Sequence, residues 1–206
     1  MSRTRFSAFT GASARVLKLF DAYHDLLIRW QAKLNLVAAS TERDIWDRHF
    51  LDSAQLCQCL PPQHSPGPWI DVGSGAGFPG LVVSLLGYYP VHLVERNKKK
   101  AEFLREVISA THSNAVVHSQ SLEDLQLPTA AVISARALAP LCRLLSLVEP
   151  ISDDKTICFF PKGRQFSDDL TRARKYWNIR CKLKSSITDS AARIIIVEDF
   201  NRVGTD

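Results

Sequence analysis

Several features that would define a function class are missing from this 206-residue sequence. The five cysteines form no C-x-x-C pair and the six histidines form no H-E-x-x-H, so we predict neither a disulfide framework nor a metal site. No apolar run approaches the ~18 residues of a membrane span, and no signal-peptide core follows the first residues. We therefore expect a cytoplasmic protein that has no membrane partner.

The composition is that of an ordinary globular chain. Hydrophobic residues make up 46% and charged residues 23%, and this length suffices to bury a full core, so we expect a single domain spanning 1–206. The formal net charge of +5 is compatible with a polyanionic partner without requiring one.

The most informative stretch is 69–80, WIDVGSGAGFPG. Apolar residues around an acid lead into a glycine-rich turn, and an apolar helical pattern follows, which predicts the first unit of a nucleotide-binding βαβ fold. The glycines permit φ > 0 and a close approach of the backbone to a ligand, which makes Gly73, Gly75 and Gly77 candidate cofactor-binding residues. Because Gly75-x-Gly77-x-x-Gly80 also matches the dinucleotide fingerprint, an NAD-dependent oxidoreductase is one alternative.

Two acids favour a different cofactor. Asp71 ends the first predicted strand, where a carboxylate can reach a cationic amine, and Glu95 ends the second, at about the ~20-residue interval typical of an acid that binds ribose hydroxyls. S-adenosylmethionine carries an ammonium, a sulfonium and a ribose diol, whereas an NAD site needs only the second acid. The alternatives are that Asp71 is a surface acid and that Glu95 is a helix N-terminal acid favoured by the macrodipole.

The hydrophobic patterning predicts two parts. Residues 1–62 form an N-terminal helical cap, with a frayed segment 1–10, a helix over 13–34, and a second helix that opens at the N-cap pattern Thr41-x-x-Asp44 and stops before Pro61. Residues 69–198 form a Rossmann-like α/β core with a mostly parallel sheet and helices on both faces. The expected strands are 69–72, 91–95, 115–118, 131–135, 156–160 and a final pair near 181–187 and 193–198. The expected helices lie near 78–87, 98–111, 140–148 and 166–177.

The loops after the strands should converge on one site. Glu123 follows the third strand and is a candidate for adenine binding. Ser121 capping a short helix there is an equally plausible interpretation, and it does not exclude the first. After the fourth strand comes Arg136, which at this edge of a sheet either binds a ligand or pairs with an acid. The loop after the fifth strand carries Lys162 and Arg164, which either hold RNA phosphate or the target base, or are solvent-exposed cations.

Two other features bear on the chemistry: the residues that the loops lack, and a basic segment near the C-terminus. Neither an Asn/Asp-Pro-Pro-aromatic clamp nor a cysteine nucleophile occupies the loops, because Cys142 lies past the fourth loop and Cys158 lies inside a strand. The basic segment 172–184 contains Tyr176 and Trp177, and we interpret it as a solvated helix face with both rings in the core.

Five segments together resemble one family. They are Asn35-Leu36, Arg48-His49-Phe50-Leu51-Asp52-Ser53, the stretch 71–80, Ser134-Ala135-Arg136-Ala137 and Lys162-Gly163. In this order they look like the RsmG (GidB) family, which methylates N7 of a guanine in 16S ribosomal RNA with S-adenosylmethionine. The chain departs from the family pattern at Ala130-Ala131, Val37 and Ala191-Ala192-Arg193.

The resemblance implies a class I S-adenosylmethionine-dependent methyltransferase fold with a seven-stranded sheet. It implies cofactor contacts at Gly73, Phe78, Leu122, Glu123 and Arg136, with Glu95 at the ribose. It places His49 and Asp52 beside the site and Lys162 on the RNA side. We expect Arg136 and Lys162 to be catalytic, and His49, Asp52, Lys162 and Arg164 to bind substrate.

The implied partner is 16S ribosomal RNA or a small ribosomal subunit particle, and we expect the protein itself to be a monomer. Guanine N7 has a lone pair and no proton, so direct in-line transfer needs no general base. A second alternative to this enzyme is a non-catalytic RNA-binding or ribosome assembly protein on the same scaffold, which the basic segment 172–184 motivates.

Overall fold

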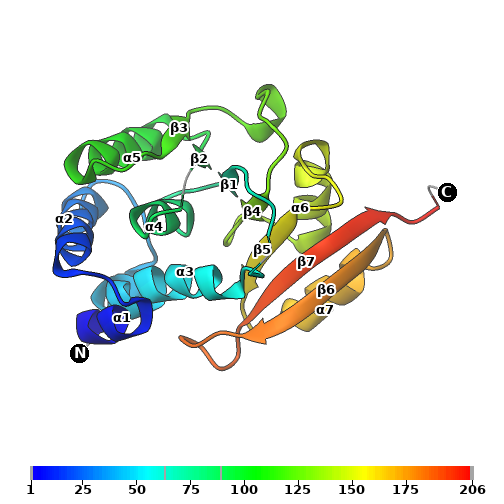
Figure 1. Cartoon of the computed structure of the whole chain (residues 1–206), viewed down its shortest axis with the longest axis horizontal. Helices are drawn as coiled ribbons and strands as arrows, with labels where there is room; N and C mark the ends of the chain where they lie inside the picture. The colour runs from blue at the N-terminus through cyan, green and yellow to red at the C-terminus, as the bar shows by residue number, and fades with distance from the viewer. Residues whose placement is uncertain (1, 63, 89, 205–206) are drawn as a thin grey trace.

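A twisted sheet with helices on both faces forms the centre of the computed structural model, which describes residues 2–62, 64–88 and 90–204 (Figure 1). The seven strands of this sheet follow the order β3-β2-β1-β4-β5-β7-β6. Neighbours among β1 to β5 are parallel, and β7 is antiparallel to both β5 and β6. The strands are β1 (Trp69–Val72), β2 (Val91–Val94), β3 (Val116–His118), β4 (Val132–Ser134), β5 (Ile157–Lys162), β6 (Trp177–Ser185) and β7 (Arg193–Arg202). The mostly parallel sheet predicted from the sequence is confirmed.

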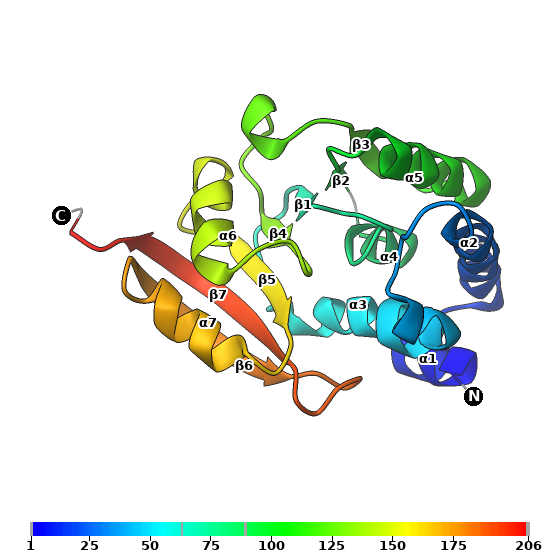
Figure 2. The ribbon, with the colours of Figure 1, turned by 180° about the vertical axis from the view of Figure 1, so that it is seen from behind.

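The central strands are apolar on both faces, because helices cover both. In β1, Trp69 packs into one hydrophobic cluster while Ile70 and Val72 pack into the other. The first cluster is covered by the N-terminal helices together with α4 (Gly80–Leu85) and α5 (Lys98–Thr111). The second is covered by α6 (Leu141–Val148) and α7 (Phe166–Ala173), which lie on the other side of the sheet (Figure 2).

The first ten residues depart from the sequence prediction. They form a helix, α1 (Ser2–Thr10), and are not frayed. Phe6 is completely buried, and its ring packs edge-on against Phe20, Trp46 and Phe50 with centroid separations of 4.6, 5.5 and 6.3 Å. Phe6, with the partly buried Phe9, therefore anchors the helix to the core, although α1 has no amphipathic repeat.

The second cap helix is irregular. After α2 (Ala14–Gln31), the chain forms a 3-10 turn (Ala39–Asp44), a π-helical segment (Trp46–Leu51), α3 (Asp52–Ala54) and another 3-10 turn (Gln55–Cys59). The predicted N-cap at Thr41 is wrong, since Thr41 lies inside the first turn and its hydroxyl bonds Ala38 O and His49. The π-helical segment carries His49 towards the sheet.

The basic segment 172–184 also differs from its prediction. Helix α7 ends at Ala173, and Trp177 begins β6, so most of the segment is a strand. Trp177 is buried as expected, but the Tyr176 side chain is 64% exposed. Two of the cations form ion pairs across the antiparallel ladder, Arg180 and Lys182 with Glu198.

The sheet order determines where a ligand site can lie. From β1 the chain moves outward through β2 and β3, and then returns to place β4 on the other side of β1. Crevices at such switch points, outside the carboxyl ends of the strands, are the usual ligand sites of open α/β sheets. No helix within the described ranges is both long and apolar enough to cross a membrane.

Candidate active site

A cavity of about 800 Å³ lies at this switch point. Its walls come from the loops after β1, β2, β3 and β4, from the start of α5, from the cap and from one side of α6 (Leu141–Val148). The lining residues comprise Leu36, Val72–Gly75, Phe78, Val94–Asn97, Lys100, Gln120–Asp124, Arg136–Ala139, Arg143 and Leu147. Of the predicted cofactor residues it brings together Gly73, Gly75, Phe78, Glu95, Leu122, Glu123 and Arg136.

The glycine turn after β1 forms one wall of the cavity. Gly73 has φ +71°, a backbone conformation that favours glycine, and a Cβ there would also displace a terminal methyl of the exposed Leu138 side chain, 2.7 Å away. Gly77 serves another purpose: a Cβ there would collide with the Tyr23 hydroxyl, and Gly77 does not line the cavity. That hydroxyl donates a hydrogen bond to Ala76 O, which ties the turn to the cap.

Asp71 is fully buried and lies behind the glycine turn. One carboxylate oxygen accepts a hydrogen bond from Ser134 Oγ (2.6 Å), and the other accepts from the backbone N–H of Gly80 (3.1 Å). Burial raises its pKa to about 6, against the opposing effect of these hydrogen bonds. Because Asp71 does not line the cavity, the structure does not place its carboxylate where the sequence predicted contact with a ligand amine. It holds β1, β4 and the start of α4 together.

Glu95 faces the cavity at the end of β2. Its Oε2 accepts from Gly75 N at 2.9 Å and its Oε1 accepts from Asn97 N at 2.7 Å. The side chain of Asn97, in turn, caps α5 by accepting from Lys99 N and Lys100 N. Asn97 is thus the N-cap residue of α5, and Glu95 is the acid that joins the loops after β1 and β2.

The loop after β3 closes the far end of the cavity. Leu122 is buried, whereas Glu123 is exposed and pairs with Arg143 at 3.4 Å. A short 3-10 helix (Leu122–Asp124) begins after Ser121 as predicted, but the Ser121 side chain makes no capping bond to it.

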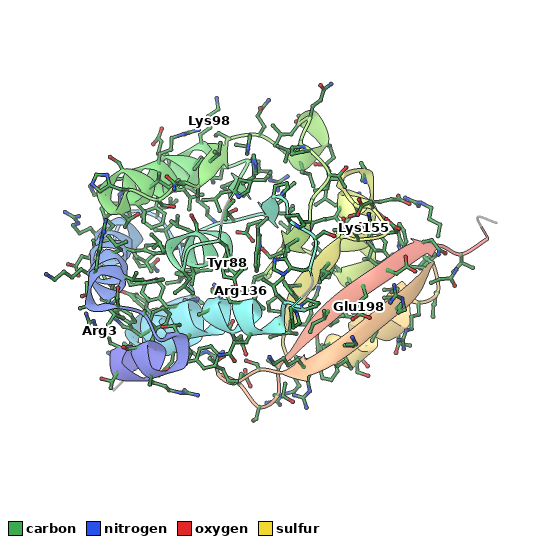
Figure 3. The ribbon with its side chains drawn as sticks, viewed as in Figure 1. Arg3, Tyr88, Lys98, Arg136, Lys155 and Glu198 are labelled. Atoms are coloured by element: carbon green, nitrogen blue, oxygen red, sulfur yellow. The ribbon has the colours of Figure 1, made fainter. Side chains whose placement is uncertain are left out.

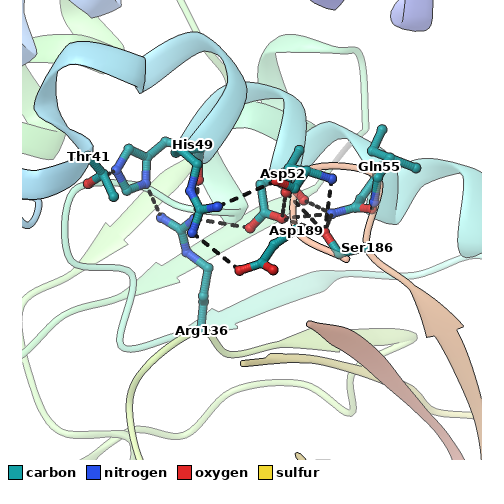
Figure 4. Close-up of polar contacts among 10 residues, drawn as sticks. Thr41, His49, Asp52, Gln55, Arg136, Ser186 and Asp189 are labelled. Atoms are coloured by element: carbon teal, nitrogen blue, oxygen red, sulfur yellow. Dashed lines mark hydrogen bonds and ion pairs between the residues drawn. The ribbon is translucent and has the colours of Figure 1, made fainter. Parts of the chain in front are cut away.

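Arg136 extends from the loop after β4 towards the cap (Figures 3 and 4). Its Nη1 donates to Arg48 O at 3.2 Å and to Asp52 Oδ2 at 3.3 Å, and its Nη2 donates to His49 Nδ1 at 2.9 Å. The guanidinium also lies 5.0 Å from the centre of the Phe78 ring. Three of its five N–H groups are occupied in this way by groups of the described chain, which leaves two for a ligand.

His49 is held as a neutral imidazole. Arginine can only donate, so Nδ1 is the acceptor and Nε2 carries the proton, which points at Thr41 Oγ1 at 2.8 Å. Burial, reinforced by the charges of Arg136 and Arg48, lowers the His49 pKa to about 3. The ring is 8% exposed and stacks on Phe78 with a centroid separation of 4.9 Å. With its Nδ1 lone pair occupied, His49 orients Arg136 and is not available as a general base.

The structure does not bring Lys162 or Arg164 to the cavity wall. Lys162 Nζ donates to Ala139 O at 2.7 Å and forms an ion pair with Asp169 at 2.9 Å. Both oxygens of Asp169 also accept from the backbone N–H of Leu141, at the start of α6. Lys162 therefore supports the cavity wall from behind through Ala139, while Arg164 is exposed.

Sequence reasoning missed several residues of this region. Leu36 lines the cavity because the Gln31 carboxamide accepts from Leu36 N and Val37 N at 2.9 and 3.0 Å and shapes the segment after α2. Ala137 lines it with φ +54°, an uncommon conformation for a residue that is not glycine. The Asn35-Leu36 pair was a signal for the first, since it belongs to the motifs that resemble a family.

Comparison with known proteins identifies what this chain is similar to. The family model described as rRNA small subunit methyltransferase G matches residues 16–195. A protein of Rhodospirillum centenum named ribosomal RNA small subunit methyltransferase G is 46% identical over 197 residues, which cover 96% of this chain and 90% of that protein. The protein of the same name from Paramagnetospirillum magneticum is 40% identical, with coverages of 94% and 93%.

Solved structures resemble the fold. The ribosomal protein L11 methylase of Lactobacillus delbrueckii subsp. bulgaricus superposes with a TM-score of 0.57 at 14% identity, covering 78% of this chain and 79% of that one. A putative S-adenosyl-L-methionine-dependent methyltransferase of Methanococcus maripaludis gives a TM-score of 0.55 at 11% identity, with coverages of 73% and 84%. At these identities the likeness shows the fold alone, which is that of class I methyltransferases.

Proposed function

This chain belongs to the rRNA small subunit methyltransferase G family, and we propose that it methylates N7 of a guanine in 16S ribosomal RNA with S-adenosylmethionine as methyl donor. One observation carries the proposal: residues matching the family motifs, distant in sequence, line or abut a single cavity at the switch point of the sheet. The cavity lies where open α/β folds bind nucleosides.

The residues present fit this methyl donor. At Gly73 and Gly75 no side chain covers the backbone of one cavity wall. A Cβ at these positions would narrow the cavity or strain the turn, because both glycines have positive φ. Glu95 presents a carboxylate edge for ribose hydroxyls, and Leu122 and Glu123 offer an apolar surface and an acceptor for adenine. We assign Phe78 and Arg136 to the end where the methyl group lies.

The proposed chemistry demands positioning more than proton transfer. When bound, S-adenosylmethionine supplies a methyl group that its positively charged sulfur activates. Since guanine N7 has an in-plane lone pair and no proton, no side chain has to act as a base, and the neutral, occupied His49 agrees with this. The role that remains for Arg136 is to orient the reacting groups with its two unoccupied N–H groups.

The remaining predicted residues take supporting roles in this proposal. His49 and Asp52 orient Arg136, Asp71 shapes the glycine turn, and Lys162 braces the wall at Ala139. Arg164, which is exposed beyond β5, is the candidate for contact with RNA phosphate.

The substrate is 16S ribosomal RNA, either naked or within a small-subunit particle. We propose that the protein acts as a monomer in the cytoplasm. The family match does not favour an NAD-dependent oxidoreductase or a non-catalytic RNA-binding protein.

A methylation assay tests the proposal. Purified protein is incubated with radiolabelled S-adenosylmethionine and either unmodified 16S RNA or small subunits, and N7-methylguanine is mapped by borohydride–aniline cleavage. We expect one cleavage site, and at least a hundredfold loss of incorporation in Arg136→Lys, because lysine cannot reproduce the planar fork of donors. Arg105→Lys, on the exposed side of α5, is the control. Label absent from both RNAs, or located at an atom other than N7, would overturn the assignment.

A further inference from the structure

The connection between β6 and β7 reaches across the molecule to the cap, beside Arg136 (Figure 4). Ile187 donates its N–H to Gln55 Oε1 at 3.0 Å, and its carbonyl accepts from Arg5 at 2.7 Å. Asp189 pairs with Arg48 at 3.6 Å. This connection, residues 186–192, is thus fixed to the cap at several points, although more than 130 residues separate it from Gln55.

Within this contact, Asp52 is the residue that joins the connection to the active site. Its Oδ1 accepts from Thr188 Oγ1 at 2.6 Å, from Gln55 Nε2 at 2.8 Å and from Ser186 Oγ at 3.3 Å. Its Oδ2 pairs with Arg136 at 3.3 Å. With three donors on Oδ1, the carboxylate has one preferred rotation, and that rotation presents Oδ2 to Arg136.

The Thr188 hydroxyl is the closest donor to the Asp52 carboxylate. Thr188 Oγ1 directs its single proton to Asp52 Oδ1, at the short distance typical of a charge-assisted bond. Ser186 Oγ accepts from Thr188 N at 3.2 Å and from Gln55 Nε2 at 3.2 Å, and its own proton has two acceptors, Thr188 Oγ1 at 3.0 Å and Asp52 Oδ1 at 3.3 Å. With either acceptor for the Ser186 proton, Thr188 remains the donor to Asp52.

We propose that Thr188, supported by Ser186, is a positioning residue for the reaction: it sets the rotation of Asp52 and, through Asp52, the orientation of the Arg136 guanidinium. The inference rests on the proposed function, because it assigns Arg136 to the reacting groups. Neither residue lines the cavity, so the effect of the Thr188 hydroxyl passes through Asp52. The Thr188 carbonyl also accepts from Arg48 at 3.4 Å, and a change of the Thr188 side chain keeps that carbonyl. A displacement of about 1 Å at a group that aligns reactants costs up to about 100-fold in rate, and partial loss of orientation costs less.

Replacement of the hydroxyl tests this inference. Thr188→Val keeps the shape and removes the proton donor, and Thr188→Ser keeps the donor. We expect kcat for RNA methylation to fall about tenfold in Thr188→Val, with the Kd for S-adenosylmethionine within about twofold of wild type, and Thr188→Ser to restore the rate. Thr111→Val is the matched control, because it removes a buried threonine hydroxyl that bonds Val107 O in α5, remote from the site.

A second measurement is independent of catalysis. Phenylglyoxal modification of Arg136, followed by peptide mass spectrometry, reports how firmly the guanidinium is held. We expect several-fold faster modification in Thr188→Val and the wild-type rate in Thr188→Ser and Thr111→Val. An unchanged rate of modification, or equal kcat values for the valine and serine variants, would overturn the inference. Wild-type protein that methylates no RNA would instead contradict the proposed function, and the modification rates would still decide the role of Thr188.

Discussion

Glu95 accepts a hydrogen bond from the backbone of Gly75, twenty residues earlier in the chain, at 2.9 Å. The acid at the end of β2 thereby fixes the turn at the end of β1, and its other oxygen fixes Asn97 before α5. The proposed ribose-binding carboxylate is therefore also the structural link between two walls of the cavity.

Glu95→Gln should weaken S-adenosylmethionine binding by about 10- to 100-fold. Glutamine replaces one acceptor oxygen with an N–H₂ group that faces a backbone donor, and it removes the charge that strengthens both bonds. Isothermal titration calorimetry measures the change, with Glu102→Gln on the exposed side of α5 as control. A Kd equal to that of wild type would contradict the ribose assignment.

Gly77→Ala should destabilise the fold by more than Gly87→Ala does. Both glycines have positive φ, +92° and +99°, so alanine pays a similar backbone cost at each position. A Cβ at position 87 meets no atom within 4 Å, whereas at position 77 it collides with the buried Tyr23 hydroxyl. Urea denaturation should show an additional loss of about 1–3 kcal/mol for Gly77→Ala. Equal losses of unfolding free energy in the two variants would show that the glycine turn can shift away from Tyr23 at no cost in stability.

Lys162→Met should lower stability by up to about 3 kcal/mol, because it removes the closer ion-pair partner of the largely buried Asp169 carboxylate and leaves the exposed Arg172, at 3.7 Å. Lys175→Met, at an exposed position, is the control. Asp169→Asn combined with Lys162→Met should recover part of the loss, since no unpaired charge then remains. If Lys162→Met instead kept full stability and lost methyl transfer, the result would favour the catalytic role predicted from the sequence over this structural role.

The pH dependence of stability should carry a contribution from His49. Its folded-state pKa of about 3 lies below the usual 6.5, so below pH 6.5 the unfolded chain binds a proton that the folded chain does not. The free energy of unfolding therefore falls as the pH drops from 6.5 towards 3, by up to about 5 kcal/mol. His49→Asn keeps an acceptor near Nδ1 without titrating, and its denaturation profile should be flatter over this range. Parallel profiles for the two proteins would contradict the buried, neutral state.

Local signals predicted the core of this fold well. The first five strands lie within two residues of their predicted bounds, because short apolar runs between glycine and polar turns determine them. The glycine turn and Glu95 were found from spacing alone. What local patterns omit is the partner of each side chain. Asp71 looked like a ligand-binding acid, but Ser134, 63 residues later, and the missing Cβ of Gly80 give it a buried structural role.

The same limit explains the errors at the two ends of the chain. The segment 2–10 has two aromatic residues among mostly polar ones, and the packing of Phe6 against Phe20 and Phe50, which lie far along the chain, stabilises α1. At the other end, the periodicity of 166–177 suits a helix, yet pairing with β7 turns the chain into a strand at Trp177. Long-range pairing overrides local preference in both cases.

The contact of residues 186–192 with the cap also has a temporal meaning. Synthesis proceeds from the N-terminus, so the cap, the glycine turn and Arg136 all leave the ribosome before Thr188 exists. Until residue 188 has been synthesised, the Asp52 carboxylate lacks its closest hydrogen-bond donor, at 2.6 Å. Competence to modify a ribosome would thus arrive only when translation of the enzyme itself is almost over.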